Sequence, residues 1–228
     1  MTWKHHRIWI IIVLALSGAV IAWLMLTTPP DASNTQAIEQ LPAASDLSGR
    51  AIYTNGEYGF AITYPETARI EERFSNEYNL SSMWRTTALP NSTGTPIVSI
   101  VGYSTVSDHS YPRQWSAQIR IGASRDLLEK AACLMADANK GEQVLPDLVQ
   151  NGTTWKAFSF GDAGMMQYVR GVSYRTMHEG ACIALEKIQS GSNYRDDPKS
   201  IDDIEDEMLQ VRYQNLDSIV ESFSFARP

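Results

Sequence analysis

The residues best suited to chemistry are two of the four histidines, the two cysteines and one acidic run. Imidazole is the usual proton carrier near neutral pH, and nucleophilic hydrolysis needs one beside a Ser or Cys. His109 lies in a polar run before a Tyr-Pro pair, which predicts an exposed loop, and His178 lies beside a predicted turn. The elbow motif G-x-S-x-G is absent, because three Gly-x-Ser segments lack its second glycine. We therefore expect no catalytic residue and no chemical role for either histidine.

Two patterns could bind a metal ion. The segment His178-Glu179-Gly180-Ala181-Cys182 is similar to the zinc motif H-E-x-x-H, whose ligands share one helix face. A glycine between two β-forming runs predicts a hairpin turn there instead. The acidic run lacks the spacing of a calcium loop, and acidic residues are favoured in the first turn of a helix. We interpret it as a solvated helix start after a cap at Ser200, and expect no metal site and no cofactor. The run contains Asp202, Asp203, Glu205, Asp206 and Glu207.

The cysteines, Cys133 and Cys182, are predicted to form a disulfide. An even count suits one bond in an exported domain, whereas two buried thiols would be more usual in the cytosol. A helix from a Ser124 cap to about residue 136 places Cys133 opposite its apolar stripe, and Cys182 alternates away from its apolar strand neighbours. Closing a loop of this length stabilises a fold by about 4 kcal/mol. The stripe, expected to face the core, contains Leu127, Ala131 and Leu134.

An uncharged apolar segment spans residues 8–26. As a helix it would be about 28 Å long, close to the hydrocarbon thickness of a bilayer. Basic residues precede it, and none follows before Arg50, which predicts an N-terminus in the cytoplasm. We expect a tail at 1–7, a transmembrane anchor at 8–26, a flexible linker at 27–50 and an extracytoplasmic domain at 51–228. The alternative is a cleaved signal peptide, whose apolar region is usually shorter.

The expected partners are a membrane, through the anchor, and a protein of the cell envelope. The net charge is −7, and the charges of the first fifty residues cancel, so the excess belongs to the domain. An acidic domain is repelled by phosphate backbones, so nucleic acid is not an expected partner.

The domain is predicted to be α+β, an antiparallel sheet with packed helices, because strands in hairpin order alternate with two helical segments. Asn151-Gly152 and Glu179-Gly180 predict tight hairpins, and a glycine-rich segment at 161–164 predicts a third turn. The last helix is expected to follow Ser200 and to break near Asn215. Strands are expected at 59–64, 68–74, 97–103, 116–121, 148–150, 153–160, 168–177 and 182–188.

Two short segments resemble PsbP-like domains of the Mog1 fold. Glu57-Tyr58-Gly59-Phe60-Ala61-Ile62-Thr63-Tyr64-Pro65 resembles their opening strand, which follows a short first strand, and residues 216–225 are similar to their last helix and strand. The sequence also resembles bacterial membrane-anchored or secreted proteins with the same opening and a late cysteine pair. The resemblance implies a PsbP/Mog1-like fold and an accessory, extracytoplasmic role, and it carries no catalytic residue.

The first functional hypothesis is a membrane-anchored, extracytoplasmic, non-catalytic module for binding or assembly. The alternatives are a hydrolase-like enzyme with a dispersed site and a ligand-sensing domain. A deep cleft with converging polar groups would favour these alternatives. A flat, exposed apolar patch would favour a partner surface.

Overall fold

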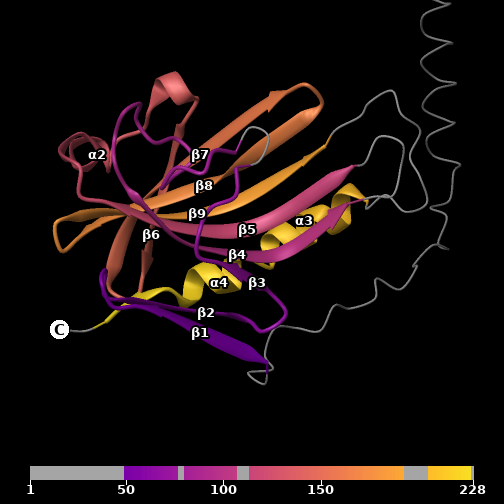
Figure 1. Ribbon diagram of the computed structural model, residues 1–228, viewed down its shortest axis with the longest axis horizontal. Coiled ribbons are helices and arrows are strands. Elements are labelled where there is room, and N and C mark those ends of the chain that lie inside the picture. The colour runs from indigo at the N-terminus through magenta and orange to yellow at the C-terminus, as the bar shows by residue number, and fades with distance from the viewer. Residues whose placement is uncertain (1–48, 77–79, 107–112, 193–204, 227–228) are drawn as a thin grey trace, which may run out of the picture. The chain divides into compact units, whose positions relative to one another are not determined.

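The structure is a computed structural model, and it describes residues 49–76, 80–106, 113–192 and 205–226 (Figure 1). The predicted anchor at 8–26, the tail at 1–7 and the linker up to residue 48 lie outside the described residues. Within the described part of the chain, no helix is both long and apolar enough to cross a membrane.

The described residues form two antiparallel sheets with short helices, which confirms the predicted α+β class. The strand orders are β1-β2-β10 and β3-β4-β5-β9-β8-β7-β6. The strands are β1 (Arg50–Asn55), β2 (Phe60–Pro65), β3 (Arg69–Glu71), β4 (Thr95–Val106), β5 (Gln114–Ser124), β6 (Gln143–Gln150), β7 (Thr153–Gly164), β8 (Gln167–His178), β9 (Ala181–Ser192) and β10 (Ser224–Phe225). The helices are α2 (Leu127–Ala132), α3 (Asp206–Gln214), α4 (Asp217–Ser222) and the 3-10 helix η1 (Ala138–Lys140).

One face of the seven-stranded sheet, here called the apolar face, carries the main core. Strand side chains alternate between faces, and on β5 the odd-numbered residues from Ala117 to Ala123 all join this core. The apolar face is covered by α4 and by the small sheet, whose Phe60 and Ile62 are fully buried in it (Figure 1). The expected break in the last helix is confirmed, because α3 ends at Gln214 and α4 begins at Asp217.

The opposite, polar face is displayed by the even-numbered residues of β5. It is partly covered by segment 80–94, which precedes β4. This segment lies directly against β5, since a Cβ atom on Gly122 would lie 1.9 Å from the backbone oxygen of Trp84. Only glycine permits so close an approach without a shift. Trp84 packs there in a small second core with Ala88, Cys133, Cys182 and Ala184.

Three two-residue turns join the strands from β6 to β9, and each has two positive φ angles. Asn151-Gly152 and Glu179-Gly180 form turns as predicted. The third prediction is wrong: β7 continues through the glycine-rich segment 161–164, and the turn is formed by Met165 and Met166. Strand pairing overrides the local turn preference of the glycines, because Gly161 and Gly164 pair with β8.

Candidate functional site

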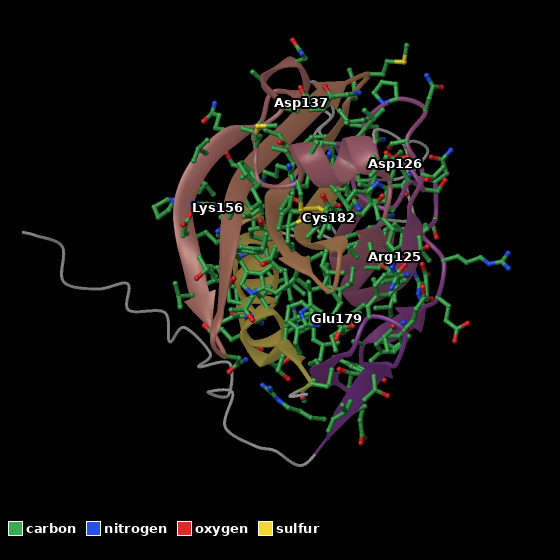
Figure 2. All side chains as sticks on the ribbon, turned by 90° about the vertical axis from the view of Figure 1, so that its left-hand side faces the viewer. Arg125, Asp126, Asp137, Lys156, Glu179 and Cys182 are labelled. Carbon is green, nitrogen blue, oxygen red and sulfur yellow. A yellow bond between two sulfur atoms is a disulfide. The ribbon has the colours of Figure 1, made fainter. Side chains whose placement is uncertain are left out.

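The predicted disulfide between Cys133 and Cys182 is confirmed. The two Cα atoms lie 5.7 Å apart, and both residues are fully buried. The bond ties the end of α2 to the start of β9 (Figure 2). We call this the disulfide end of the seven-stranded sheet; it is the end at which β5 and β8 finish. Cys182 faces away from the main core as expected, yet it is packed in the second core described above.

The helix beside Cys133 is inverted relative to the prediction. Its cap is Asp126, whose carboxylate accepts hydrogen bonds from the backbone N–H groups of Leu128 and Glu129, whereas Ser124 belongs to β5. The expected core stripe faces solvent, and Glu129, with 0% exposure, faces the sheet together with Cys133. We call the exposed apolar group the α2 patch: Leu127 (77% exposed), Leu128 (63%), Leu134 (44%) and Met135 (59%).

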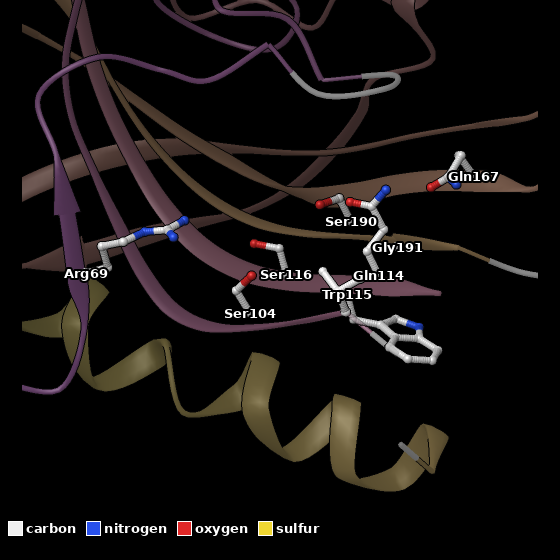
Figure 3. Close-up of a pocket in the computed structure, with 9 residues that line it drawn as sticks. Arg69, Ser104, Gln114, Trp115, Ser116, Gln167, Ser190 and Gly191 are labelled. Atoms are coloured by element: carbon white, nitrogen blue, oxygen red, sulfur yellow. The ribbon is translucent and has the colours of Figure 1, made fainter. Parts of the chain in front are cut away.

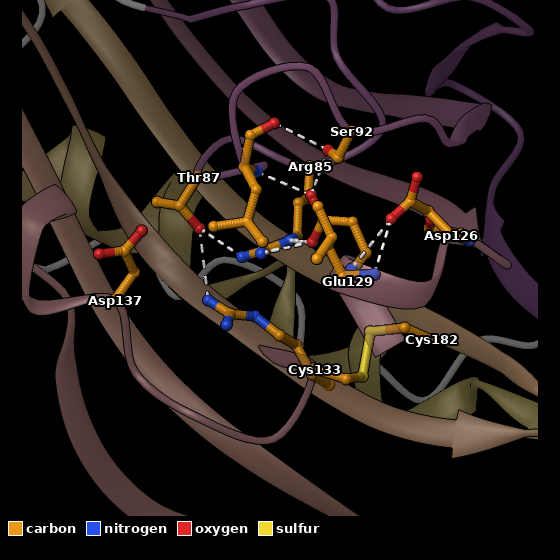
Figure 4. A network of polar contacts seen from close by, with 12 residues as sticks. Arg85, Thr87, Ser92, Asp126, Glu129, Cys133, Asp137 and Cys182 are labelled. Atoms are coloured by element: carbon orange, nitrogen blue, oxygen red, sulfur yellow. Dashed lines mark hydrogen bonds and ion pairs between the residues drawn. A yellow bond between two sulfur atoms is a disulfide. The ribbon is translucent and has the colours of Figure 1, made fainter. Parts of the chain in front are cut away.

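Glu129 is held inward by a buried ion pair with Arg85 (Figure 4). Arg85 Nη2 and Nε donate to Glu129 Oε2 at 2.7 and 3.1 Å. The other carboxylate oxygen accepts from Ser92 Oγ at 2.5 Å and from the backbone N–H of Leu89 at 2.7 Å. Burial acts to raise the pKa of Glu129, but the hydrogen bonds from Ser92 and Arg85 outweigh it and hold the pKa below its ordinary value.

A second buried pair continues this network towards β8. Arg175 pairs with Glu142, which also accepts a hydrogen bond from Thr87. Arg175 Nη1 reaches the backbone oxygen of Met135 at 3.2 Å, so the guanidinium fixes the segment that follows α2. Burial and the nearby charge of Arg85 lower the pKa of Arg175. The covering elements are thus attached to the sheet by paired charges as well as by the disulfide.

These contacts explain why the helix is inverted. Successive residues of an α-helix lie about 100° apart, so a side that holds both Glu129 and Cys133 leaves Leu127 and Leu134 on the other side. A buried carboxylate is tolerated only when it is paired and hydrogen-bonded. The network supplies those partners from segment 80–94, which sequence periodicity does not reveal.

An open groove of about 460 Å³ adjoins the start of α2. Arg125 forms its side, donating to Glu57 at 2.8 Å and lying over the ring of Tyr58 at 4.7 Å. Asp126, the cap of α2, also lines the groove, whereas the residues of the α2 patch do not. In the described part of the chain, no three His, Cys, Asp or Glu side chains are grouped to hold a metal ion.

The histidines and the acidic run have ordinary surroundings where they are described. His178 stacks on Phe225, with ring centroids 3.6 Å apart, and its Nε2 lies 4.0 Å from Glu179. His109 lies outside the described residues, as do Ser200, Asp202 and Asp203. The predicted helix start directly after Ser200 is wrong, because α3 begins at Asp206 with Glu205 in an extended conformation as its N-cap. The interpretation as a solvated first turn is confirmed for Asp206 and Glu207, which are exposed there.

Sequence reasoning missed the buried charges. Arg85 lies in a segment without periodicity, and Glu129 and Glu142 look like ordinary surface acids. One signal was present: polar residues alternate with apolar ones from Gln114 to Ile121 in β5, a strand that is buried over most of its length. That pattern indicates a second, polar covered face.

The solved structures that are similar to this chain include the following two. LpqN of Mycobacterium tuberculosis, which is involved in cell envelope biogenesis, shares 12% identity over 78% of this chain and 91% of its own, with a TM-score of 0.38. Cyanobacterial PsbP (CyanoP) of Synechocystis sp. PCC 6803 shares 9% identity over 81% of this chain and 98% of its own, also with a TM-score of 0.38. A PsbP is therefore among the structural neighbours, in agreement with the resemblance found in the sequence. At this TM-score the likeness does not extend to site residues or activity. No family model matches the chain, and no curated protein matches it.

Proposed function

We propose that this protein is a membrane-anchored, extracytoplasmic, non-catalytic module that binds a protein partner through the α2 patch. The observation that carries the proposal is the inverted helix, which buries Glu129 and exposes three leucines and a methionine. Contiguous exposed apolar side chains are uncommon on monomeric soluble proteins and mark interaction sites.

The inversion is costly, which argues that the exposed leucines have a role. Removing a carboxylate and a guanidinium from water costs several kcal/mol per ion, and an apolar packing of the same volume is often at least as stable. The chain nevertheless commits Arg85 and Ser92 to hold Glu129 inward. The opposite orientation of α2, with Leu127 and Leu134 facing the sheet, would need no buried charge, but it would leave no exposed apolar patch.

The charges around the patch define the partner. Asp126 and Asp137 accept backbone hydrogen bonds as caps of α2 and η1. Lys130 and Lys140 form no ion pair within the described residues. The complementary surface is therefore apolar, with carboxylates opposite these two lysines, on an envelope protein that is not strongly acidic overall. An anionic lipid surface is a weaker fit, because the domain carries the whole net charge of −7.

The anchored, extracytoplasmic placement is supported by two features. The uncharged segment at 8–26 has basic residues only on its N-terminal side, and the disulfide suits an oxidising compartment. Intact-mass analysis of protein extracted from native membranes tests the anchor. A retained leader is expected, and a mature N-terminus beyond residue 26 would contradict it.

The partner is sought by placing a photo-crosslinking residue at Leu128 in the full chain in native membranes. The matched control carries it at Val149, an equally exposed residue of β6 outside the α2 patch. We expect one envelope protein to crosslink at 128 and not at 149. Its purified extracytoplasmic part should bind the wild-type protein in solution and lose that binding with Leu128→Glu.

Two results would overturn the proposal. The first is identical crosslinking at both positions. The second is that the wild-type protein floats with anionic vesicles but not with neutral ones, and that Leu128→Glu abolishes this flotation. That result would make the ligand of the α2 patch a lipid surface.

A further inference from the structure

A second candidate site lies on the same polar face, at the other end of the seven-stranded sheet, which we call the pocket end. There β4 and β9 finish and β5 and β8 begin. A pocket of about 80 Å³ is floored by three serines, Ser104, Ser116 and Ser190 (Figure 3). Ser116 is paired in register with both of the others, so three neighbouring strands present their hydroxyl groups in one row.

The other polar lining residues are two amides and one guanidinium, and Val106, Trp115 and Gly191 complete the lining. Gln114 and Gln167 contribute from the neighbouring row, and Arg69 extends over the pocket from β3 (Figure 3). Arg69 also pairs with Glu71 on its own strand at 3.0 Å, and its side chain remains 66% exposed and accessible to a ligand. None of the lining residues is acidic, although acidic residues outnumber basic ones in the chain.

This lining selects for one kind of ligand group. A guanidinium pairs with planar oxyanions through two parallel N–H donors, and hydroxyl and amide groups can donate further hydrogen bonds to the same oxygens. A cation has no carboxylate in the pocket to bind. The volume is small, so it holds a single functional group rather than a whole large ligand.

We propose that this pocket binds a carboxylate, with Arg69 as the ion-pair partner and Ser104, Ser116 and Gln114 as hydrogen-bond donors. The carboxylate belongs either to a free small acid or to the C-terminus of a peptide. The pocket and the α2 patch lie at opposite ends of the same strands. Carboxylate binding in the pocket does not depend on the protein partner proposed for the α2 patch. Binding leaves all covalent bonds of ligand and protein unchanged.

The test uses the full chain in nanodiscs and ligand-observed NMR. The probes are acetate and the tripeptide Gly-Gly-Ala, each compared with its uncharged analogue, acetamide or the C-terminal amide. We expect saturation transfer to the acids and none to the amides. Arg69→Gln should weaken binding roughly tenfold or more, because a charge-assisted contact is lost. The matched control, Arg73→Gln, changes an exposed arginine outside the pocket and should bind as the wild type does.

The results also separate the two sources. A lower Kd for the tripeptide than for acetate assigns the pocket to peptide C-termini, and equal values assign it to free acids. Equal binding of acids and amides overturns the proposal, as does unchanged binding in both Arg69→Gln and Ser116→Val. The crosslinking experiment at Leu128 tests the α2 patch, and its outcome does not depend on whether the pocket binds a carboxylate.

Discussion

The disulfide end and the pocket end of the sheet are built on the same strands but differ in how their polar side chains are satisfied. At the disulfide end, segment 80–94 and α2 cover the sheet, and Arg85, Glu129, Glu142 and Arg175 are fully buried in ion pairs. At the pocket end, the lining is mostly neutral hydroxyl and amide groups, and a pocket stays open. The covering segment, rather than the strands, therefore decides what each end of the sheet face presents.

The physical reason is the cost of burying charge. Neutral hydroxyl groups can stay at a solvent-accessible surface without a fixed partner, whereas buried carboxylates need one. Once α2 turns Glu129 towards the sheet, its leucines must face solvent. One end therefore offers an apolar surface and the other a polar hollow.

The largest effect is expected from breaking the buried pair at the disulfide end. Arg85→Met leaves Glu129 buried without its cation, which should lower the free energy of unfolding by about 3–5 kcal/mol. The matched change at the pocket end, Arg69→Met, removes an exposed partner of Glu71 and should lower the free energy of unfolding by less than about 1 kcal/mol. Urea unfolding of both variants measures the contrast. Similar losses of unfolding free energy in the two variants would show that the buried and the exposed ion pair stabilise the fold equally.

Removing the disulfide should have a comparable or slightly smaller effect. Cys133 and Cys182 are 49 residues apart in the sequence. On the chain-entropy model, replacing both by alanine costs about 4 kcal/mol, within a usual range of 2–5. Hydrogen exchange should show faster opening of α2 than of β4 at the pocket end. Two free thiols in non-reducing mass analysis of envelope-derived protein would contradict the bond itself.

Gly122→Ala should separate segment 80–94 from the sheet. The added Cβ atom would lie 1.9 Å from the Trp84 oxygen, so the segment must shift. Overpacking of this kind costs about 1–3 kcal/mol. The matched control is Gly56→Ala, where a Cβ atom meets nothing within 4 Å. A red shift of tryptophan emission in Gly122→Ala alone would report the exposure of Trp84, and identical spectra would argue against this contact.

The buried carboxylate should make the disulfide end sensitive to acid. The pKa of Glu129 in the folded protein is held below 4.5, so its ionised form stabilises the fold at pH values above 4.5. That contribution is lost as the pH falls through the lowered pKa. NMR titration of the Glu129 carboxyl carbon should therefore give a midpoint below 4.5. A midpoint at or above this value would mean that burial outweighs the hydrogen bonds.

The smallest effect is expected at the hairpin tips. Met165 and Met166 adopt φ angles of 45° and 63°, whereas Glu179-Gly180 uses glycine at the second position. Because left-handed backbone is strained for methionine, Met165→Asn with Met166→Gly should raise the free energy of unfolding by about 0.5–1 kcal/mol. The reverse exchange, Glu179→Met with Gly180→Met, should lower it. A destabilised Asn-Gly variant would indicate that the methionines pack against a described neighbour.

Features of the fold that depend on local residue spacing could be predicted from the sequence. Period-two alternation and the Asn151-Gly152 and Glu179-Gly180 pairs predicted antiparallel strands and their turns, and the even cysteine count indicated the disulfide. The α+β class follows from the order of those elements.

The side of α2 that faces inward and the closure of the polar face depend instead on contacts between distant parts of the chain. The helix pattern alone favours burying Leu127 and Leu134, and it would be correct for an isolated amphipathic helix. The opposite orientation is imposed by an arginine 44 residues before Glu129 and a cysteine 49 residues after Cys133. Such partners have no signature within one window of sequence, because the burial free energy of a charge depends on what the rest of the fold brings to it.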